Sequence, residues 1–149
     1  MTTISLKNLD EVLSELEALA QAKTIQTSNW SVYRILQHCA QTIEYSMSGY
    51  PTSKPKWLQL TVGKLAIFKF LKQGYMSHDL AAPVPGSPEL TYEGSAAEGI
   101  AILRASILKF KQFNGPLKPH LFFGELSKEE YDQYFAMHIA NHFSEISYL

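Results

Sequence analysis

The sequence predicts a single all-α domain with four main helices, one accessory helix and a long crossover between the second and third main helices. Apolar residues recur at three- and four-residue steps in five separate segments, which is the spacing of one helix face. Two serine–glutamate capping boxes stand at the starts of the last two segments. The chain shows no alternating strand pattern longer than four residues, and its length of 149 residues suits one domain over residues 1–149.

The composition narrows the class of protein. Hydrophobic residues make up 46% and charged residues 18% of the chain, which is too apolar for a disordered protein. Thirteen Lys and Arg stand against fourteen Asp and Glu, so the net charge is −1 and the basic excess of a nucleic-acid-binding protein is missing. The one cysteine excludes an intramolecular disulfide and a Cys-rich zinc module. No secretory leader and no run of about 18 apolar residues is visible. We therefore expect a cytoplasmic protein with no nucleic-acid partner and no membrane partner.

The first two main helices follow from their apolar stripes and end signals. The first stripe consists of Leu6, Leu9, Leu13, Leu16 and Ala20. Asn8, with Glu11 three residues later, predicts the N-cap of this helix. Residues 22–29 are polar and predict a connection. The second helix is predicted over residues 30–47, and the Gly-Tyr-Pro sequence at 49–51 ends it, because Gly supplies a left-handed cap and Pro cannot continue a helix.

Residues 52–74 predict the accessory helix. Its apolar positions at helical spacing are Trp57, Leu60, Leu65, Phe68 and Leu71. The segment also carries five lysines and no acidic residue. Two interpretations stay open: the lysines form a solvated face whose stems cover apolar surface, or they attract an anionic ligand.

Residues 75–94 predict a long crossover loop stiffened by several prolines, and loops of this length in a compact domain are often functional. The capping box at residues 95–98 starts the third main helix, which stops at the Asn-Gly-Pro sequence 114–116. The capping box at residues 127–130 starts the last helix, which is predicted to run nearly to the end of the chain.

Two histidines of the last helix share one face. His138 and His142 are separated by four residues, lie within about 40° of each other on a helical wheel, and line up with Tyr131 and Phe135. This face is the apolar one, so both imidazoles are predicted to point at the core. Burying them is unfavourable unless their nitrogens are paired. A metal ion, backbone carbonyls, the Glu145 carboxylate or the Tyr131 hydroxyl would each satisfy them.

His38 is the candidate third member of this group. It lies more than about 100° around the second helix from the centre of that helix's apolar stripe. It is therefore either a surface histidine or part of a second inward edge that faces the last helix. Three histidines from two helices can hold a tetrahedral ion with an open fourth position, and helix-bundle cores commonly carry such sites.

The remaining candidates lie outside this pattern. His120 precedes the last helix and is interpreted either as a capping or surface residue or as a residue that contacts the substrate or the metal ligands. His78 lies in the crossover beside Asp79 and is predicted to be structural or exposed. Cys39 lies on the apolar stripe of the second helix, which favours a small buried hydrophobic side chain over a nucleophile.

Seven short motifs follow one another along the chain. They are Asn29-Trp30-Ser31, His38-Cys39-Ala40, Gly49-Tyr50-Pro51, Pro83-Val84-Pro85-Gly86, Pro119-His120, Phe123-Gly124 and His138-Ile139-Ala140-Asn141-His142. In this order they resemble the DinB/YfiT-like superfamily of metalloenzymes, and most closely a branch of uncharacterised proteins described only as a domain of unknown function. The resemblance covers nearly the whole chain.

The resemblance implies a four-helix bundle of DinB/YfiT type with a long crossover after the second helix. It implies that His38, His138 and His142 hold a divalent metal ion, commonly nickel or zinc in the superfamily, whose members often form homodimers. Some members of the superfamily are thiol S-transferases or thiol-dependent isomerases that use a low-molecular-weight thiol as co-substrate.

Three hypotheses of function result. The first is a metal-dependent enzyme that acts on a small electrophilic molecule by thiol-dependent transfer or isomerisation, or that activates water for hydrolysis, with His120 relaying a proton or orienting the ligand. The second is a non-enzymatic protein that binds a small ligand or a metal ion. The third is a structural bundle whose histidines are satisfied internally. The substrate itself does not follow from a fold and a set of ligands.

Overall fold

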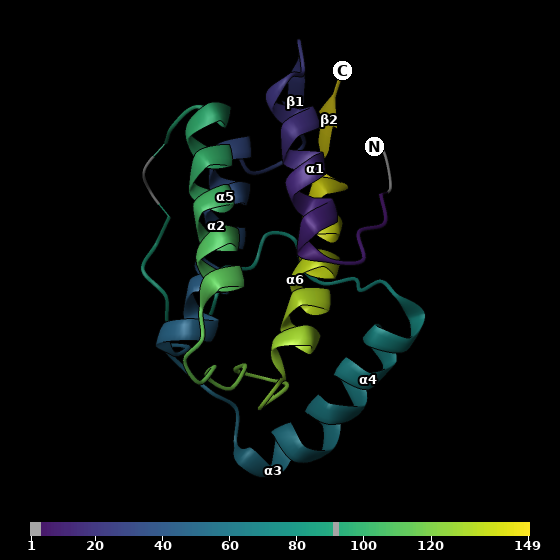
Figure 1. Cartoon of the computed structure of the whole chain (residues 1–149), viewed down its shortest axis with the longest axis vertical. Coiled ribbons are helices and arrows are strands. Elements are labelled where there is room, and N and C mark those ends of the chain that lie inside the picture. Colours follow the sequence, from purple (N-terminus) through teal and green to yellow (C-terminus); the bar gives the residue numbers. More distant parts are fainter. Residues whose placement is uncertain (1–3, 91–92) are drawn as a thin grey trace.

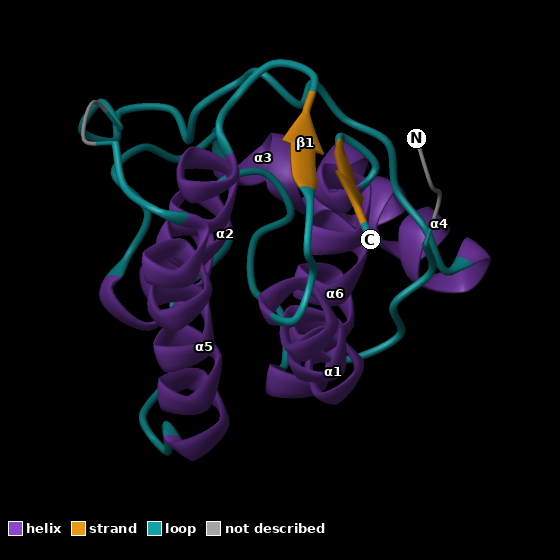
Figure 2. Cartoon of the chain, turned by 90° about the horizontal axis from the view of Figure 1, so that it is seen from above, coloured by secondary structure: helices purple, strands orange, loops and turns teal. Residues whose placement is uncertain are grey.

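The computed structural model describes residues 4–90 and 93–149. Its long helices are α1 (Leu9–Ala20), α2 (Val32–Ser48), α5 (Ala96–Gln112) and α6 (Lys128–Phe143). Helix α2 packs against α5 and α6, and α1 packs against the same two helices, so that two helix pairs lie side by side (Figure 2). The prediction of a helical fold is confirmed. Within the described residues, no helix is both long and apolar enough to cross a membrane.

The helices begin at the side-chain caps that the sequence predicts. The Asn8 side chain accepts a hydrogen bond of 2.9 Å from the backbone N–H of Glu11. Complete capping boxes at residues 95–98 and 127–130 start α5 and α6. Each such cap contributes about 0.5–2 kcal/mol. Helix α2 is capped by Ser31, so it starts slightly later than predicted.

A small sheet corrects the prediction that the chain contains helices alone. Strand β1 (Ile25–Thr27) pairs antiparallel with β2 (Ile146–Tyr148), with Gln26 opposite Ser147. The strands lie at one end of the molecule and α4 at the other (Figure 1). The polar connection at residues 22–29 therefore contains a strand, and the last helix stops at Phe143 instead of running nearly to the end. Strands of three residues are too short to show an alternating pattern, and their partners are far apart in sequence.

The accessory segment is one continuous helical rod with an irregular turn. It consists of α3 (Lys56–Leu58), the π-helical turn η1 (Gln59–Gly63) and α4 (Lys64–Gln73). A Cβ atom on Gly63 would lie 2.1 Å from the carbonyl oxygen of Phe122. Only glycine allows this approach of two backbones. The glycine that interrupts the predicted helix is thus the point at which the rod contacts the chain just before α6.

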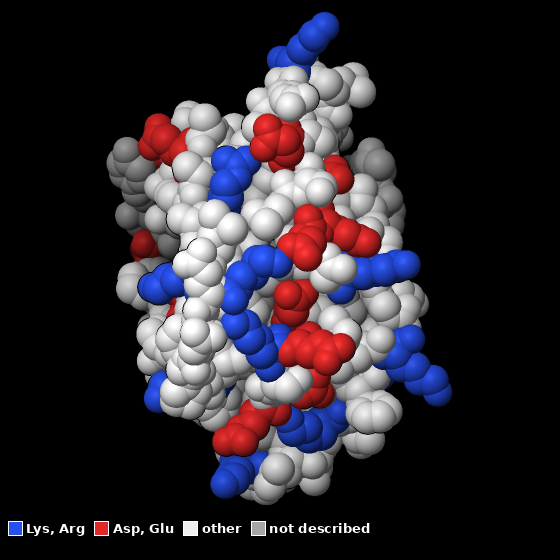
Figure 3. All heavy atoms as spheres, viewed as in Figure 1, with Lys and Arg blue, Asp and Glu red and all other residues white. Residues whose placement is uncertain are grey.

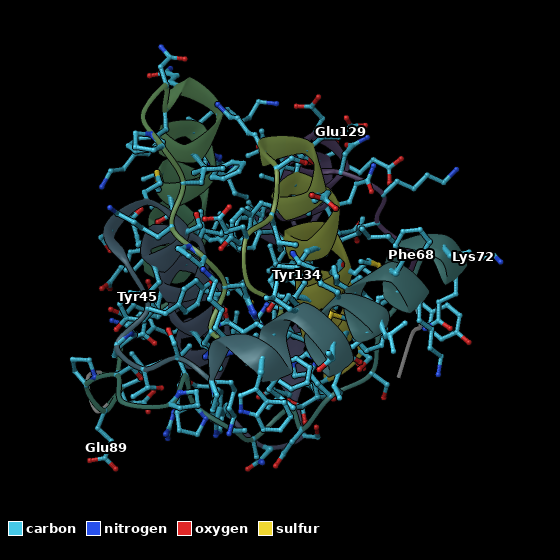
Figure 4. The ribbon with its side chains drawn as sticks, turned by 90° about the horizontal axis from the view of Figure 1, so that it is seen from below. Tyr45, Phe68, Lys72, Glu89, Glu129 and Tyr134 are labelled. Atoms are coloured by element: carbon cyan, nitrogen blue, oxygen red, sulfur yellow. The ribbon has the colours of Figure 1, made fainter. Side chains whose placement is uncertain are left out.

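The buried face of this rod differs from the predicted apolar stripe. Four of the five predicted stripe residues are exposed: Trp57, Leu60, Leu65 and Phe68. The buried side is formed instead by Gln59, Gly63 and Ile67. Phe68 is 73% exposed whereas Ile67 is 3% exposed, and Phe68 and Lys72 lie on the outer side of α4 (Figure 4). The exposed residues include Trp57 before the π-helical turn and Phe68 after it, so the whole apolar stripe faces away from the bundle.

The crossover between the accessory rod and α5 has neither helix nor strand in its described part, residues 75–90 and 93–94, as predicted. Met76 and Val84 anchor it, because both side chains are buried. On the face that carries α1 and α5, acidic and basic side chains are interleaved (Figure 3). The Arg104–Glu17 and Lys111–Asp10 ion pairs link these two helices, and exposed pairs of this kind contribute little stability.

Candidate metal centre

Helices α2 and α6 bring three histidines together inside the molecule. His38 comes from α2, and His138 and His142 come from successive turns of α6. One ligand nitrogen of each lies within 4.8 Å of the others. Their side chains are 3%, 5% and 0% exposed, respectively. His38 therefore faces the last helix, and the alternative of a surface histidine is wrong.

The position of His38 follows from the two packed faces of α2. The apolar stripe of this helix packs on α5, where Leu36 lies against Gly99. A second face, which carries His38, packs on α6 and is buried as well. On α6, residues from Tyr134 to Ala140 are all buried. A helix with neighbours on several sides hides polar positions that a simple amphipathic pattern would place in water.

The nitrogens of these histidines lack ordinary partners. In the described part of the chain, His38 Nδ1 and His142 Nδ1 are buried without a hydrogen bond. The Tyr131 hydroxyl donates instead to the carbonyl of Lys118 at 2.6 Å, and Glu145 Oε2 is itself buried and unpaired. Each orphaned buried group costs about 1–3 kcal/mol. Neither Tyr131 nor Glu145 pairs with the histidines, so a metal ion remains as the partner that fits a group of three imidazoles.

Burial keeps the three imidazoles in the form that binds metal. Burial, together with a smaller contribution from neighbouring basic groups, lowers the pKa of His38 to about 4 and the pKa of His142 to about 2. The pKa of His138 is held well below its usual value, first by burial and then by the other histidines. All three rings are therefore neutral at physiological pH, and a neutral imidazole offers a lone pair to a cation.

Trp30 covers one side of the group. It stands just before α2, is 8% exposed, and its ring lies nearly parallel to that of His142 with centroids 6.4 Å apart. The Trp30 and His38 rings meet edge-on, and their centroids are 5.5 Å apart. The Arg34 guanidinium lies over the same indole, 4.6 Å from the ring centroid. Trp30 thus shields the imidazoles from water.

His78 is a fourth histidine at the site, and the prediction that it is structural or exposed misses this. Its Nε2 atom lies 3.1 Å from Nε2 of His142, and its ring stacks on His138 with centroids 4.7 Å apart. Its Nδ1 atom lies 2.6 Å from Nδ2 of Asn141. The only sequence signal for this position is that long crossover loops often carry function, because no periodicity places a loop residue.

A cavity of about 280 Å³ opens beside the histidines. His38, His78 and His138 form one wall of it, and Tyr134, whose place on α6 is labelled in Figure 4, lies close to them. Apolar side chains line most of the rest, among them Met76, Phe123 and the residues of the 83–85 segment. A small molecule in this cavity would contact the three-histidine group directly.

His120 also lines this cavity and fixes the Tyr134 hydroxyl. Its Nδ1 atom accepts hydrogen bonds of 3.1 Å from the backbone N–H groups of Phe122 and Phe123. The ring hydrogen therefore sits on Nε2, which donates to the Tyr134 oxygen at 3.1 Å. Burial lowers the pKa of His120 to about 3. Among the described residues, no acceptor binds the Tyr134 hydroxyl hydrogen, so this hydrogen can point into the cavity.

The free cysteine takes no part in the site. Cys39 is fully buried on the apolar stripe of α2. Burial raises the pKa of its thiol far above the usual value. The interpretation of Cys39 as a small hydrophobic residue agrees with this environment, since only a thiolate is an effective nucleophile.

Comparison with known proteins identifies the family of this chain but assigns no function to it. Residues 1–148 match the family model described as "Protein of unknown function (DUF1569)". Neither the curated proteins nor the solved structures yield a significant match. Because the family match spans almost the whole chain, this protein belongs to the DUF1569 family, whose function is unknown.

Proposed function

We propose that this protein is a metal-dependent enzyme with a DinB/YfiT-like four-helix bundle, in which His38, His138 and His142 hold one divalent ion, nickel or zinc. The observation that carries the proposal is the group of three buried, neutral imidazoles, two of which, His38 and His138, line a cavity. Two of their nitrogens have no partner among the described residues. Burying three imidazoles side by side is costly unless a cation binds them.

The chemistry that such an ion supplies is Lewis acidity, which lowers the pKa of a thiol or a water molecule at its open position. The protein contributes the shape and polarity of the cavity. His38 and His138 line it, so a small molecule in this space would lie against two of the residues that would hold the ion. The buried Trp30 ring covers His38 and His142 and reduces their contact with water.

The reaction that we favour is the attack of a low-molecular-weight thiol on a small electrophilic molecule, by transfer or by isomerisation. Among the described residues that line the cavity, none is Lys or Arg, which favours an uncharged electrophile. The Tyr134 hydroxyl donates a hydrogen bond to an oxygen of this substrate. His120 is a positioning residue in this scheme, because its one ring hydrogen is already committed to Tyr134.

A second candidate function is metal or small-ligand binding without catalysis. The nearness of His78 to His142, at 3.1 Å, favours it. A fourth imidazole that permanently closed the site would leave no position for a reacting molecule, as in structural zinc sites.

Metal analysis and a thiol-transfer screen on the same freshly purified protein test the proposal. We expect one nickel or zinc ion per chain, together with turnover of a thiol and a model electrophile that is lost on chelation. Ile139→Val is the matched control for a histidine variant such as His142→Ala. Ile139 is buried on α6 between the two histidines, and its side chain cannot bind a metal ion. Metal without turnover would support the second candidate, and absence of metal would refute both.

A further inference from the structure

We propose that His78 is a fourth, exchangeable nitrogen ligand of the ion and that the Asn141 side chain controls which of its nitrogens is free to bind. The proposal rests on the proposed function only in requiring a cation at the three-histidine group. It adds His78 from the crossover and Asn141 from α6 to the site. The crossover would therefore take part in binding the ion.

The spacing of the rings fits a shared ion. Two imidazole nitrogens bound to one tetrahedral ion at about 2.0–2.1 Å lie roughly 3.3 Å apart. His78 Nε2 and His142 Nε2 are 3.1 Å apart, so a small movement of His78 would place both nitrogens on one ion. His78 is also held against the group by its stacking on His138.

The tautomer of His78 follows from the orientation of the Asn141 amide. An amide nitrogen only donates, so His78 accepts at Nδ1 from Asn141 Nδ2 at 2.6 Å and carries its hydrogen on Nε2. That hydrogen points at His142 Nε2. In this state His78 pairs with His142 through a hydrogen bond and does not offer a lone pair at Nε2.

Metal binding requires the opposite tautomer. A histidine that binds through Nε2 has its hydrogen on Nδ1 and donates it to an oxygen acceptor. A half-turn of the Asn141 amide places Oδ1 where Nδ2 now lies and supplies that acceptor, because the two amide ends have nearly the same shape. Asn141 can thus hold both states of His78 without backbone movement.

The consequence is a site with a closed and an open form. In the closed form His78 would fill the fourth position, and in the open form an incoming molecule from the cavity would take its place. His78 lines that same cavity, so it meets anything that enters. This reconciles a fourth nearby imidazole with a catalytic site, which needs an exchangeable position.

The experiment compares Zn²⁺ affinity, by competition with a chromophoric chelator, and the visible spectrum of bound Co²⁺ in full-length variants. His78→Phe keeps a ring that can stack on His138 but removes both nitrogens. Asn141→Asp offers only acceptor atoms, and Asn141→Leu offers none. Ser77→Ala is the control, since Ser77 is exposed in the same segment.

We expect His78→Phe and Asn141→Leu to weaken Zn²⁺ binding by about 10–100-fold and to change the Co²⁺ spectrum. Asn141→Asp should bind at least as tightly as the wild type, and this effect should vanish in the His78→Phe background. A general effect of the added negative charge would persist in that background and would overturn the role of Asn141. Thermal melts of the metal-free variants show that they fold.

Two results separate this proposal from the proposed function. If the wild type binds Zn²⁺ and His78→Phe binds it equally, with the same Co²⁺ spectrum, the fourth ligand is refuted and the three-histidine site stands. If the wild type itself binds no Zn²⁺, both proposals fall.

Discussion

His142→Ala should remove the metal without unfolding the protein. In the metal-free state, the substitution deletes a ring whose Nδ1 atom has no partner, which relieves about 1–3 kcal/mol. It also leaves a cavity at a fully buried position, at a cost of about 2–5 kcal/mol for large-to-small changes. The expected net loss is on the order of 2 kcal/mol, which a core of apolar helix faces withstands.

The loss of metal should have the larger effect. A ligand present at a few hundred times its Kd stabilises the folded state by about 3–4 kcal/mol. For a chain of this size, 1 kcal/mol shifts Tm by about 2–4 °C, so stripping the wild type should lower its Tm by roughly 6–16 °C. Adding metal should restore the wild type and leave His142→Ala unchanged.

The assay is metal content measured beside thermal melts of the wild type, the stripped wild type and His142→Ala. If the variant keeps a full equivalent of metal, His142 is not a ligand and the assignment is wrong. If the variant or the stripped wild type is unfolded without metal, the ion is structural, and the catalytic interpretation loses its main support.

Three further predictions follow from the burial of particular side chains. Tyr134→Phe should lower turnover while metal content stays at the wild-type level, and equal turnover would remove the hydroxyl from the mechanism. Ile67→Ala should cost about 2–5 kcal/mol of unfolding free energy and Phe68→Ala within about 0.5 kcal/mol, as urea titrations would show; the reverse order would contradict the register of α4. Burial lowers the pKa of His120 from 6.5 to about 3. Between pH 6.5 and about pH 3 the unfolded chain therefore binds more protons at this residue than the folded chain does, so the free energy of unfolding falls as the pH drops. In chelator-treated protein, acidification from pH 7 to 5 should therefore cost about 2 kcal/mol at this histidine, and His120→Phe should show a smaller loss in urea titrations at the two pH values.

The elements with strong local signals are the ones that the sequence predicts. Asn8 and the capping box at residues 127–130 cap their helices as expected, since capping depends on residues three positions apart. The strands at Ile25–Thr27 and Ile146–Tyr148 depend on pairing between the two ends of the chain, and three residues leave no readable period. The apolar stripe of the accessory segment faces outward because the rod contacts the bundle through Gly63 and Ile67, and periodicity alone does not show which face meets a neighbour.

The same division applies to the site. The inward direction of His138 and His142 follows from their alignment with Tyr131 on α6, a local property. The inward direction of His38 required knowing that α2 packs on two neighbours, so periodicity alone left it undecided. His78 depends on where a structureless segment crosses α6, which nothing in its local sequence encodes.

The central claim is that His38, His138 and His142 hold one divalent ion, and anomalous diffraction from crystals grown with Zn²⁺ or Ni²⁺ tests it most directly. The account predicts a single strong anomalous peak, about 2.0–2.1 Å from one nitrogen of each of the three imidazoles. A peak at any other place, or these three rings in clear density with no peak between them, would contradict it.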